Sequence, residues 1–285
     1  FVKRIILLIE ICLAAFIFTG SSGYIVEKEI PVNTPEFNWE NYNIITHALG
    51  GLDGFTYLNS RESFINYYDK GCRLFEVDLS LTSDGVWVCR HNWKESMGQW
   101  EGDKKKVLSS EEFLNTPIYG KYTPLSFKEL LMLLDEYPDA FVLLDSKQYS
   151  VRNYQRTLED YAKYREIAIQ SGLEHTLDQI IPELYNPAMY SGASTLYRFP
   201  AYLYSLWQEY SMEELEDIAD FCQTNKIQAV SLYWEYWSEE IQKIFDERDI
   251  LVYIYTINDE EQAREYVNGG VKGICTDTLI SENLE

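Results

Sequence analysis

Positive charge is scarce in this sequence. Its 285 residues include 24 lysines and arginines against 46 aspartates and glutamates, which gives a formal net charge of −22. A surface this acidic repels nucleic acids and anionic membranes, so we expect neither to be attracted to it. A site that handles phosphate in such a protein needs a local counter-charge, and a divalent cation is the obvious source.

Several common site motifs are also missing. Beyond residue 23 no two cysteines form a Cys-x-x-Cys pair, which argues against a zinc site or a thioredoxin-like motif. No Gly-x-Gly-x-x-Gly run follows the first predicted strand, which argues against a doubly wound dinucleotide-binding sheet. The sequence contains no internal repeat and no low-complexity tract.

Histidine occurs three times, and two of the three belong to one constellation. His47 and His91 each follow an apolar run, and Glu76 and Asp78 lie between them in the strand-like segment 75–79. Alternate side chains of a strand point to the same face, so the two carboxylates can bind one cation. Two imidazoles beside a carboxylate-bound metal provide the acid, the base and the charge clamp of phosphodiester cleavage.

The N-terminus has the order of an export signal. Two basic residues precede the almost wholly apolar run 5–18, and small residues follow. We therefore predict a signal peptide or membrane anchor over 1–23, a linker over 24–40, and a protein that is extracellular or anchored on the outer face. The apolar run is shorter than the ~20 residues of a spanning helix, and Glu10 disfavours insertion, so an ordinary buried helix is the alternative.

Strand-like and helical stretches alternate beyond residue 40. With 46% hydrophobic residues the chain has ample material for a core. We predict a parallel (β/α)8 TIM barrel over residues 41–285, with a small extra hairpin after the second strand. The predicted strands are 43–47, 73–79, 141–147, 179–184, 201–206, 229–233, 251–256 and 273–276, with 86–91 in the hairpin. The predicted helices are 60–70, 126–136, 151–171, 211–225, 238–248 and 259–268.

An ordered set of short motifs follows these strands. After His47 come Asn59-Ser60, Gly71, Glu76-Val77-Asp78, Thr82-Ser83-Asp84-Gly85, His91-Asn92, Asp145-Ser146-Lys147, Tyr255-Thr256-Ile257-Asn258, and Gly273-Ile274-Cys275-Thr276-Asp277. Each motif is weak alone, but the ordered set spans roughly residues 43 to 280. On these motifs the chain resembles the glycerophosphodiester phosphodiesterase family, within the phosphatidylinositol-phospholipase-C-like barrel enzymes.

The resemblance implies a metal-dependent hydrolase that cleaves glycerophosphodiesters into glycerol phosphate and an alcohol. It implies a divalent cation, Mg²⁺ or Ca²⁺, on Glu76, Asp78 and Asp145, all of which offer oxygen ligands. Lys147 is expected to bind the phosphate. We assign His47 as the base and His91 as the acid. By the same resemblance the nucleophile is a neighbouring hydroxyl of the substrate, and water then opens the cyclic phosphate.

The sequence departs from the family pattern at two places. Ala48 follows His47 where the family has a phosphate-contacting arginine, and Asp145 replaces the usual glutamate. Arg90 is a candidate substitute for that arginine, but its neighbour His91 is expected to point to the opposite face of the strand. These departures leave the headgroup of the substrate open. They affect the predicted reaction class less.

Candidate pocket residues and two rival functions complete the predictions. Glu183, Trp207, Tyr233 and Tyr255 lie at or near predicted strand ends, where capping or rim packing is the alternative role. One rival is a membrane-lipid phosphodiesterase of the sphingomyelinase D or phospholipase C type, with 93–100 as a lipid-contacting loop. The other is a catalytically degenerate, surface-anchored binding barrel. We expect a small phosphodiester or phospholipid-derived substrate, and a membrane tether only through the N-terminal segment.

Overall fold

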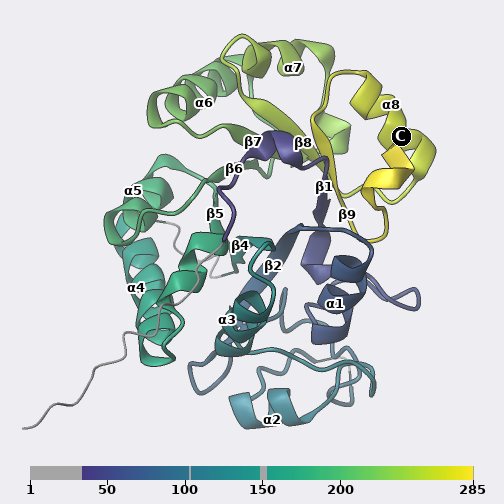
Figure 1. Cartoon of the computed structure of the whole chain (residues 1–285), viewed down its shortest axis with the longest axis vertical. Helices are drawn as coiled ribbons and strands as arrows, with labels where there is room; N and C mark the ends of the chain where they lie inside the picture. Colours follow the sequence, from purple (N-terminus) through teal and green to yellow (C-terminus); the bar gives the residue numbers. More distant parts are fainter. Residues whose placement is uncertain (1–33, 103, 148–152, 285) are drawn as a thin grey trace, which may run out of the picture. The chain divides into compact units, whose positions relative to one another are not determined.

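Eight parallel strands close into a barrel in the computed structural model, which describes residues 34–102, 104–147 and 153–284. The first strand, β1 (Ile44–Thr46), pairs with both β2 (Leu74–Leu81) and β9 (Gly273–Thr276), and these two contacts close the ring (Figure 1). This arrangement confirms the predicted TIM barrel. The other barrel strands are β4 (Phe141–Ser146), β5 (Ile180–Leu184), β6 (Leu203–Leu206), β7 (Ala229–Tyr233) and β8 (Leu251–Tyr255).

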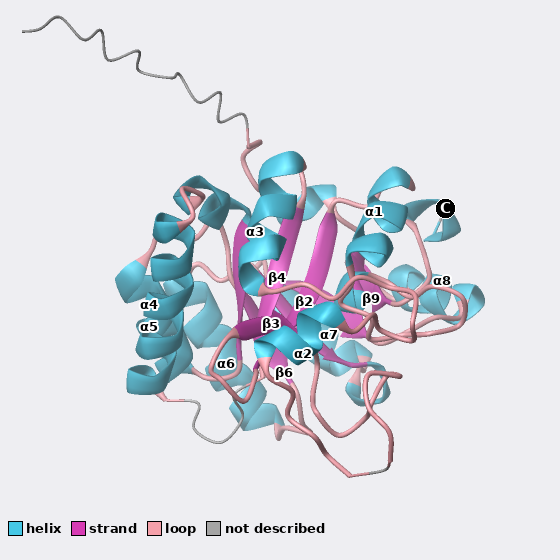
Figure 2. Ribbon diagram, turned by 90° about the horizontal axis from the view of Figure 1, so that it is seen from below, coloured by secondary structure: helices cyan, strands magenta, loops and turns pink. Residues whose placement is uncertain are grey.

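Helices surround the strands on the outside of the ring (Figures 1 and 2). Capping boxes at Ser60, Ser126 and Ser211 begin three of them, because each serine side chain accepts a bond from an otherwise unpaired backbone N–H. These helices are α1 (Arg61–Asp69), α3 (Phe127–Glu136) and α6 (Met212–Asn225). The others that match predictions are α4 (Tyr154–Gln170), α7 (Glu239–Asp246) and α8 (Glu260–Asn268).

Strand alternation decides which side chains reach the barrel interior. On β4, Phe141 and Leu143 belong to the interior cluster, whereas Val142 and Leu144 pack in the layer under the helices. Asp145 continues the inward series of β4. The register pairs it with Asp78 of β2, so the two carboxylates enter the interior at the same level.

The short strand β3 (Trp87–Cys89), inside the predicted range 86–91, pairs antiparallel with the end of β2. Two helices show where local patterns were insufficient. Helices α2 (Ser110–Asn115) and α5 (Pro187–Leu196) were not predicted. The helix α5 consists largely of small residues because it packs closely on α4: a Cβ at Gly192 would lie 2.8 Å from Cβ of Thr157. Such a helix lacks the large apolar stripe that identifies a helix in sequence.

The predicted linker ends earlier than residue 40. Phe37 and Trp39 pack into the interior cluster, and Trp39 lies 5.4 Å from the ring of Tyr253. The predicted signal or anchor over 1–23 lies outside the described residues and stays a prediction. Within the described part of the chain, no helix is both long and apolar enough to cross a membrane.

Candidate active site

His47 is fixed by a chain of hydrogen bonds at the end of β1. Its Nδ1 lies 2.8 Å from Oδ1 of Asp277, and a carboxylate only accepts, so Nδ1 carries the proton. Asn258 in turn donates to Oδ2 of Asp277 at 2.8 Å. The other imidazole nitrogen, Nε2, lies 3.9 Å from Oε2 of Glu76. The imidazole therefore presents Nε2 to the pocket.

The turn after β1, where the family pattern has an arginine, has an unusual backbone. Ala48, Leu49 and Gly50 all have positive φ (47°, 61° and 100°), which turns the Ala48 N–H toward Glu76. That N–H donates to Oε2 of Glu76 at 2.7 Å. Gly50 cannot be replaced here, because a Cβ would lie 2.2 Å from the ring of Tyr67. The main chain of Ala48 thus helps to fix the carboxylate of Glu76.

His91 lies on the same side of the pocket as His47. Its Nδ1 is 2.6 Å from Nδ2 of Asn92, and burial lowers its pKa below the ordinary value. The ring of Tyr57 lies 4.7 Å from each of the two imidazoles. Burial also raises the pKa of Tyr57 to about 12, so this phenol is neutral at pH 7. The structure thus brings His47 and His91 together at one cavity.

Asp78 has two strong partners of its own. Oδ2 accepts from Asn59 at 2.8 Å, and Oδ1 lies 2.8 Å from Nζ of Lys147. Burial by itself would raise the pKa of Asp78, but the charges of Lys147, His91 and His47 together with the lysine hydrogen bond outweigh burial, and the pKa falls to about 2. Lys147 also contacts Asp145. The pair Asp78–Lys147 is therefore a buried ion pair.

Three other carboxylates form a cluster suited to a cation. Oxygens of Glu76, Asp145 and Glu183, all buried, lie within 4.8 Å of one another. Burial and the nearby charge of Asp78 raise the pKa of Glu76 well above its ordinary value, and burial raises that of Glu183 to about 7. Oδ1 of Asp145 has no hydrogen-bond partner. Buried carboxylates with too few donors fit a hard divalent cation.

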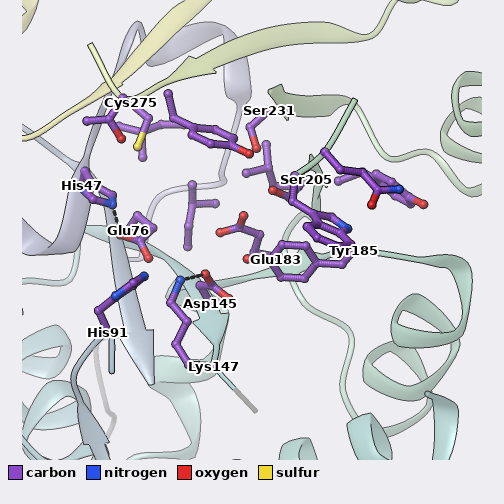
Figure 3. A pocket seen from close by; sticks show the side chains of 18 of the residues that line it. His47, Glu76, His91, Asp145, Lys147, Glu183, Tyr185, Ser205, Ser231 and Cys275 are labelled. Atoms are coloured by element: carbon purple, nitrogen blue, oxygen red, sulfur yellow. Dashed lines mark hydrogen bonds and ion pairs between the residues drawn. The ribbon is translucent and has the colours of Figure 1, made fainter. Parts of the chain in front are cut away.

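These groups line one cavity of about 770 Å³ (Figure 3). The two imidazoles lie on one side of Glu76 and Asp145, and Glu183 lies on the other side beside Tyr185. Of the predicted pocket residues, Glu183, Trp207 and Tyr255 line this cavity. Tyr233 is not one of the described residues that line the cavity. Its ring packs instead against the rings of Tyr236 and Tyr255, with centroid distances of 5.6 Å and 6.3 Å.

Arg90 does not replace the missing arginine. Its guanidinium is buried outside the cavity, where it donates to Oε1 of Gln99 (2.7 Å) and to the carbonyl oxygen of Asn92 (2.6 Å). It also lies 4.8 Å from the ring of Trp93, which is itself buried. The loop 93–100 is therefore folded around Arg90, and Trp93 offers no exposed lipid-contacting surface.

The sequence did not assign roles to several residues of the site. Asp277 was recognised as a strand-end motif residue without a function; it contacts His47 because the first and last strands pair in the closed barrel. Asn59 precedes α1 and was noted only as a motif position, although it bonds Asp78. No local signal identified Tyr57. Glu183 was predicted only as a pocket residue.

Comparison with known proteins agrees with this geometry. The model of the glycerophosphoryl diester phosphodiesterase family matches residues 51–280. The chain belongs to this family. It is accordingly a phosphoric diester hydrolase. No curated protein sequence matches it.

Solved structures share the fold at low sequence identity. A glycerophosphodiester phosphodiesterase from Parabacteroides distasonis is 15% identical, with a TM-score of 0.63 over 82% of this chain and 92% of that one. One from Thermotoga maritima is 16% identical, with a TM-score of 0.59 over 82% and 94%. A phosphodiesterase from Oleispira antarctica, solved with its product sn-glycerol-3-phosphate, is 17% identical, with a TM-score of 0.64 over 83% and 93%.

Proposed function

We propose that this enzyme hydrolyses small glycerophosphodiesters to glycerol phosphate and an alcohol. The observation that carries the proposal is the meeting of two imidazoles, a lysine and a buried carboxylate cluster in one cavity. The glycerol phosphate product bound to the Oleispira antarctica relative supports the same substrate class.

We assign the cation to Glu76, Asp145 and Glu183. Of the three predicted ligands, Asp78 lies outside this cluster and has Asn59 and Lys147 as partners, whereas Glu183 belongs to the cluster. A hard divalent cation held by these residues, such as Mg²⁺ or Ca²⁺, would neutralise part of the phosphate charge.

The side chains of the cavity perform the proton transfers. His47 presents an unprotonated Nε2 and takes the proton of the nucleophile, while Asp277 stabilises the resulting imidazolium. His91 lies across the ring of Tyr57 and protonates the leaving oxygen. Lys147, between Asp78 and Asp145, shares the charge of the phosphate.

Hydrolysis of a chromogenic phosphodiester and of glycerophosphodiesters, with and without EDTA, tests the proposal. We expect activity that EDTA abolishes and Mg²⁺ or Ca²⁺ restores. His47→Ala and His91→Ala should each lower kcat by about 10²-fold or more. The third histidine, His175, pairs with Asp135 outside the cavity, so His175→Ala is the matched control. Near-normal activity of either cavity variant contradicts the assignment.

A further inference from the structure

The roles assigned to the two histidines fix the place of the phosphate in the cavity. His47 acts on the attacking oxygen and His91 on the leaving oxygen, and these two oxygens lie roughly in line on opposite sides of the phosphorus. The phosphorus therefore lies between the two imidazoles, which Figure 3 shows on the same side of Glu76 and Asp145. A side chain that contacts both imidazoles adjoins this place.

Tyr57 is a side chain of this kind. Its ring centroid lies 4.7 Å from that of His47 and 4.7 Å from that of His91, and Tyr57 lines the cavity. The ring planes are inclined by 80° and 50° to the two imidazoles, so Tyr57 stacks flat on neither of them. Tyr57 is 38% exposed despite these two contacts, which leaves part of it open to a substrate.

The loop that carries Tyr57 is held on both sides of this residue. Before it, Phe55 stacks on Tyr119 with ring centroids 4.0 Å apart. After it, Asn59 donates a hydrogen bond of 2.8 Å to the buried carboxylate of Asp78. Tyr57 itself has a φ of 56°, in the left-handed region that a bulky residue adopts only where the surroundings impose it. The loop therefore fixes the ring against the two histidines.

The cavity has few cationic groups for a phosphate. Among the described residues that line it, Lys147 is the only lysine or arginine, and it also contacts Asp78 and Asp145. Burial and the charges of Asp78 and Asp277 raise the pKa of Tyr57 to about 12, so the phenol keeps its proton at pH 7. A neutral hydroxyl can donate a hydrogen bond to a phosphate oxygen without adding negative charge to this acidic cavity.

We infer that Tyr57 is a further catalytic residue, whose hydroxyl donates a hydrogen bond to a non-bridging phosphate oxygen between His47 and His91 in the transition state. The inference rests on the proposed function, because the roles of the two histidines place the phosphate. Tyr57 transfers no proton and forms no covalent bond. Its O–H dipole stabilises the negative charge on that oxygen.

The variant Tyr57→Phe separates the hydroxyl from the ring. It keeps the ring against both imidazoles, so we expect kcat and kcat/KM to fall together by about tenfold or more on a chromogenic diester, with little change in KM. Tyr119→Phe is the matched control, because Tyr119 is equally exposed and is not one of the described residues that line the cavity. Its kcat should equal that of the wild-type enzyme. Wild-type kcat in Tyr57→Phe, with a loss only in Tyr57→Leu, would show that the ring acts by packing and would overturn the inference.

The two phosphorothioate diastereomers of the same diester test direct contact with the phosphate. Each has sulfur in place of one non-bridging oxygen, and sulfur is a weak hydrogen-bond acceptor. The ratio of kcat/KM between the wild-type enzyme and Tyr57→Phe should stay near the value for the oxygen diester in one diastereomer and fall toward unity in the other. Equal ratios for all three diesters overturn the contact and leave the proposed function standing. Absence of hydrolysis of every oxygen diester by the wild-type enzyme with Mg²⁺ or Ca²⁺ overturns the proposed function itself.

Discussion

Asp277 holds the imidazole of His47 by a 2.8 Å contact between Oδ1 and Nδ1. The two residues are 230 positions apart in the chain, yet they lie on strands that pair in the closed barrel. The contact fixes the tautomer that leaves Nε2 free to accept a proton. The orientation of the proposed base therefore depends on the last strand of the barrel.

Removing the charge of Asp277 should slow the reaction. Asp277→Asn keeps the shape but no longer stabilises an imidazolium, so we expect kcat to fall by about 10- to 100-fold. KM should change little, because Asp277 does not line the cavity. Steady-state kinetics on a chromogenic diester measure both constants, with the exposed Asp69→Asn as control. An unchanged kcat would contradict the role of Asp277.

Two matched variants decide the third metal ligand. Glu183→Gln should weaken binding of Mg²⁺ or Ca²⁺ by about tenfold or more, as expected when one of three carboxylates is lost. Asp78→Asn should weaken it less, since Asp78 is paired with Lys147. Isothermal titration calorimetry measures both dissociation constants. A larger loss in Asp78→Asn would restore the set predicted from sequence, Glu76, Asp78 and Asp145.

Metal binding should release protons near neutral pH. Burial raises the pKa of Glu183 to about 7, so this carboxyl is mostly protonated at pH 6, and burial also raises the pKa of Glu76 well above its ordinary value. A cation needs the carboxylate forms, so its apparent affinity should rise as the pH increases from about 6 to about 8. Calorimetry in buffers of different ionisation enthalpy counts the released protons. The Glu183→Gln variant should release fewer protons on metal binding. A proton count equal to that of the wild-type enzyme would contradict the prediction.

The ion pair of Asp78 with Lys147 should stabilise the fold. Lys147→Met leaves a buried charge without its partner, so we expect a loss of about 3–5 kcal/mol in the free energy of unfolding at pH 7. Adding Asp78→Asn should recover part of that loss. Urea unfolding of both single variants and the double variant measures the coupling energy between Asp78 and Lys147. Strictly additive changes in the free energy of unfolding would show that the two residues are not coupled.

The same pair gives the fold a pH dependence of known sign. The folded-state pKa of Asp78, about 2, lies below the unfolded value of about 3.9. Its stabilisation is therefore complete above about pH 4 and is lost as the pH falls toward 2. Lys147→Met should flatten this part of the stability profile.

Arg90 should matter for the loop that carries His91. Arg90→Met removes donors to Asn92 and Gln99 and leaves buried acceptors unpaired, which we expect to cost about 2–3 kcal/mol of unfolding free energy. kcat should fall as well, because the loop positions the proposed acid. The exposed Lys94→Ala in the same loop is the control. Wild-type stability and kcat in Arg90→Met would contradict this structural role.

The sequence predicted the barrel because its signals are local. Alternation of apolar runs and capped helices needs no knowledge of distant contacts. All eight barrel strands and β3 overlap their predicted ranges: β7 and β9 match fully, and the others differ only at their ends. The period of two likewise placed Glu76 and Asp78 on one face and turned Arg90 away from His91. The helix α5 escaped prediction because close packing on α4 selects small residues.

The sequence by itself therefore determined the barrel, the two histidines and the inward carboxylates of β2 and β4, since each follows from strand period and strand ends. Only the tertiary structure decided which of these groups touch. Strand pairing across the closed ring brought Asp277 to His47, and the curvature of the barrel brought Glu183 of β5 to Glu76 of β2. Distances between strands depend on register and closure, which no local pattern contains.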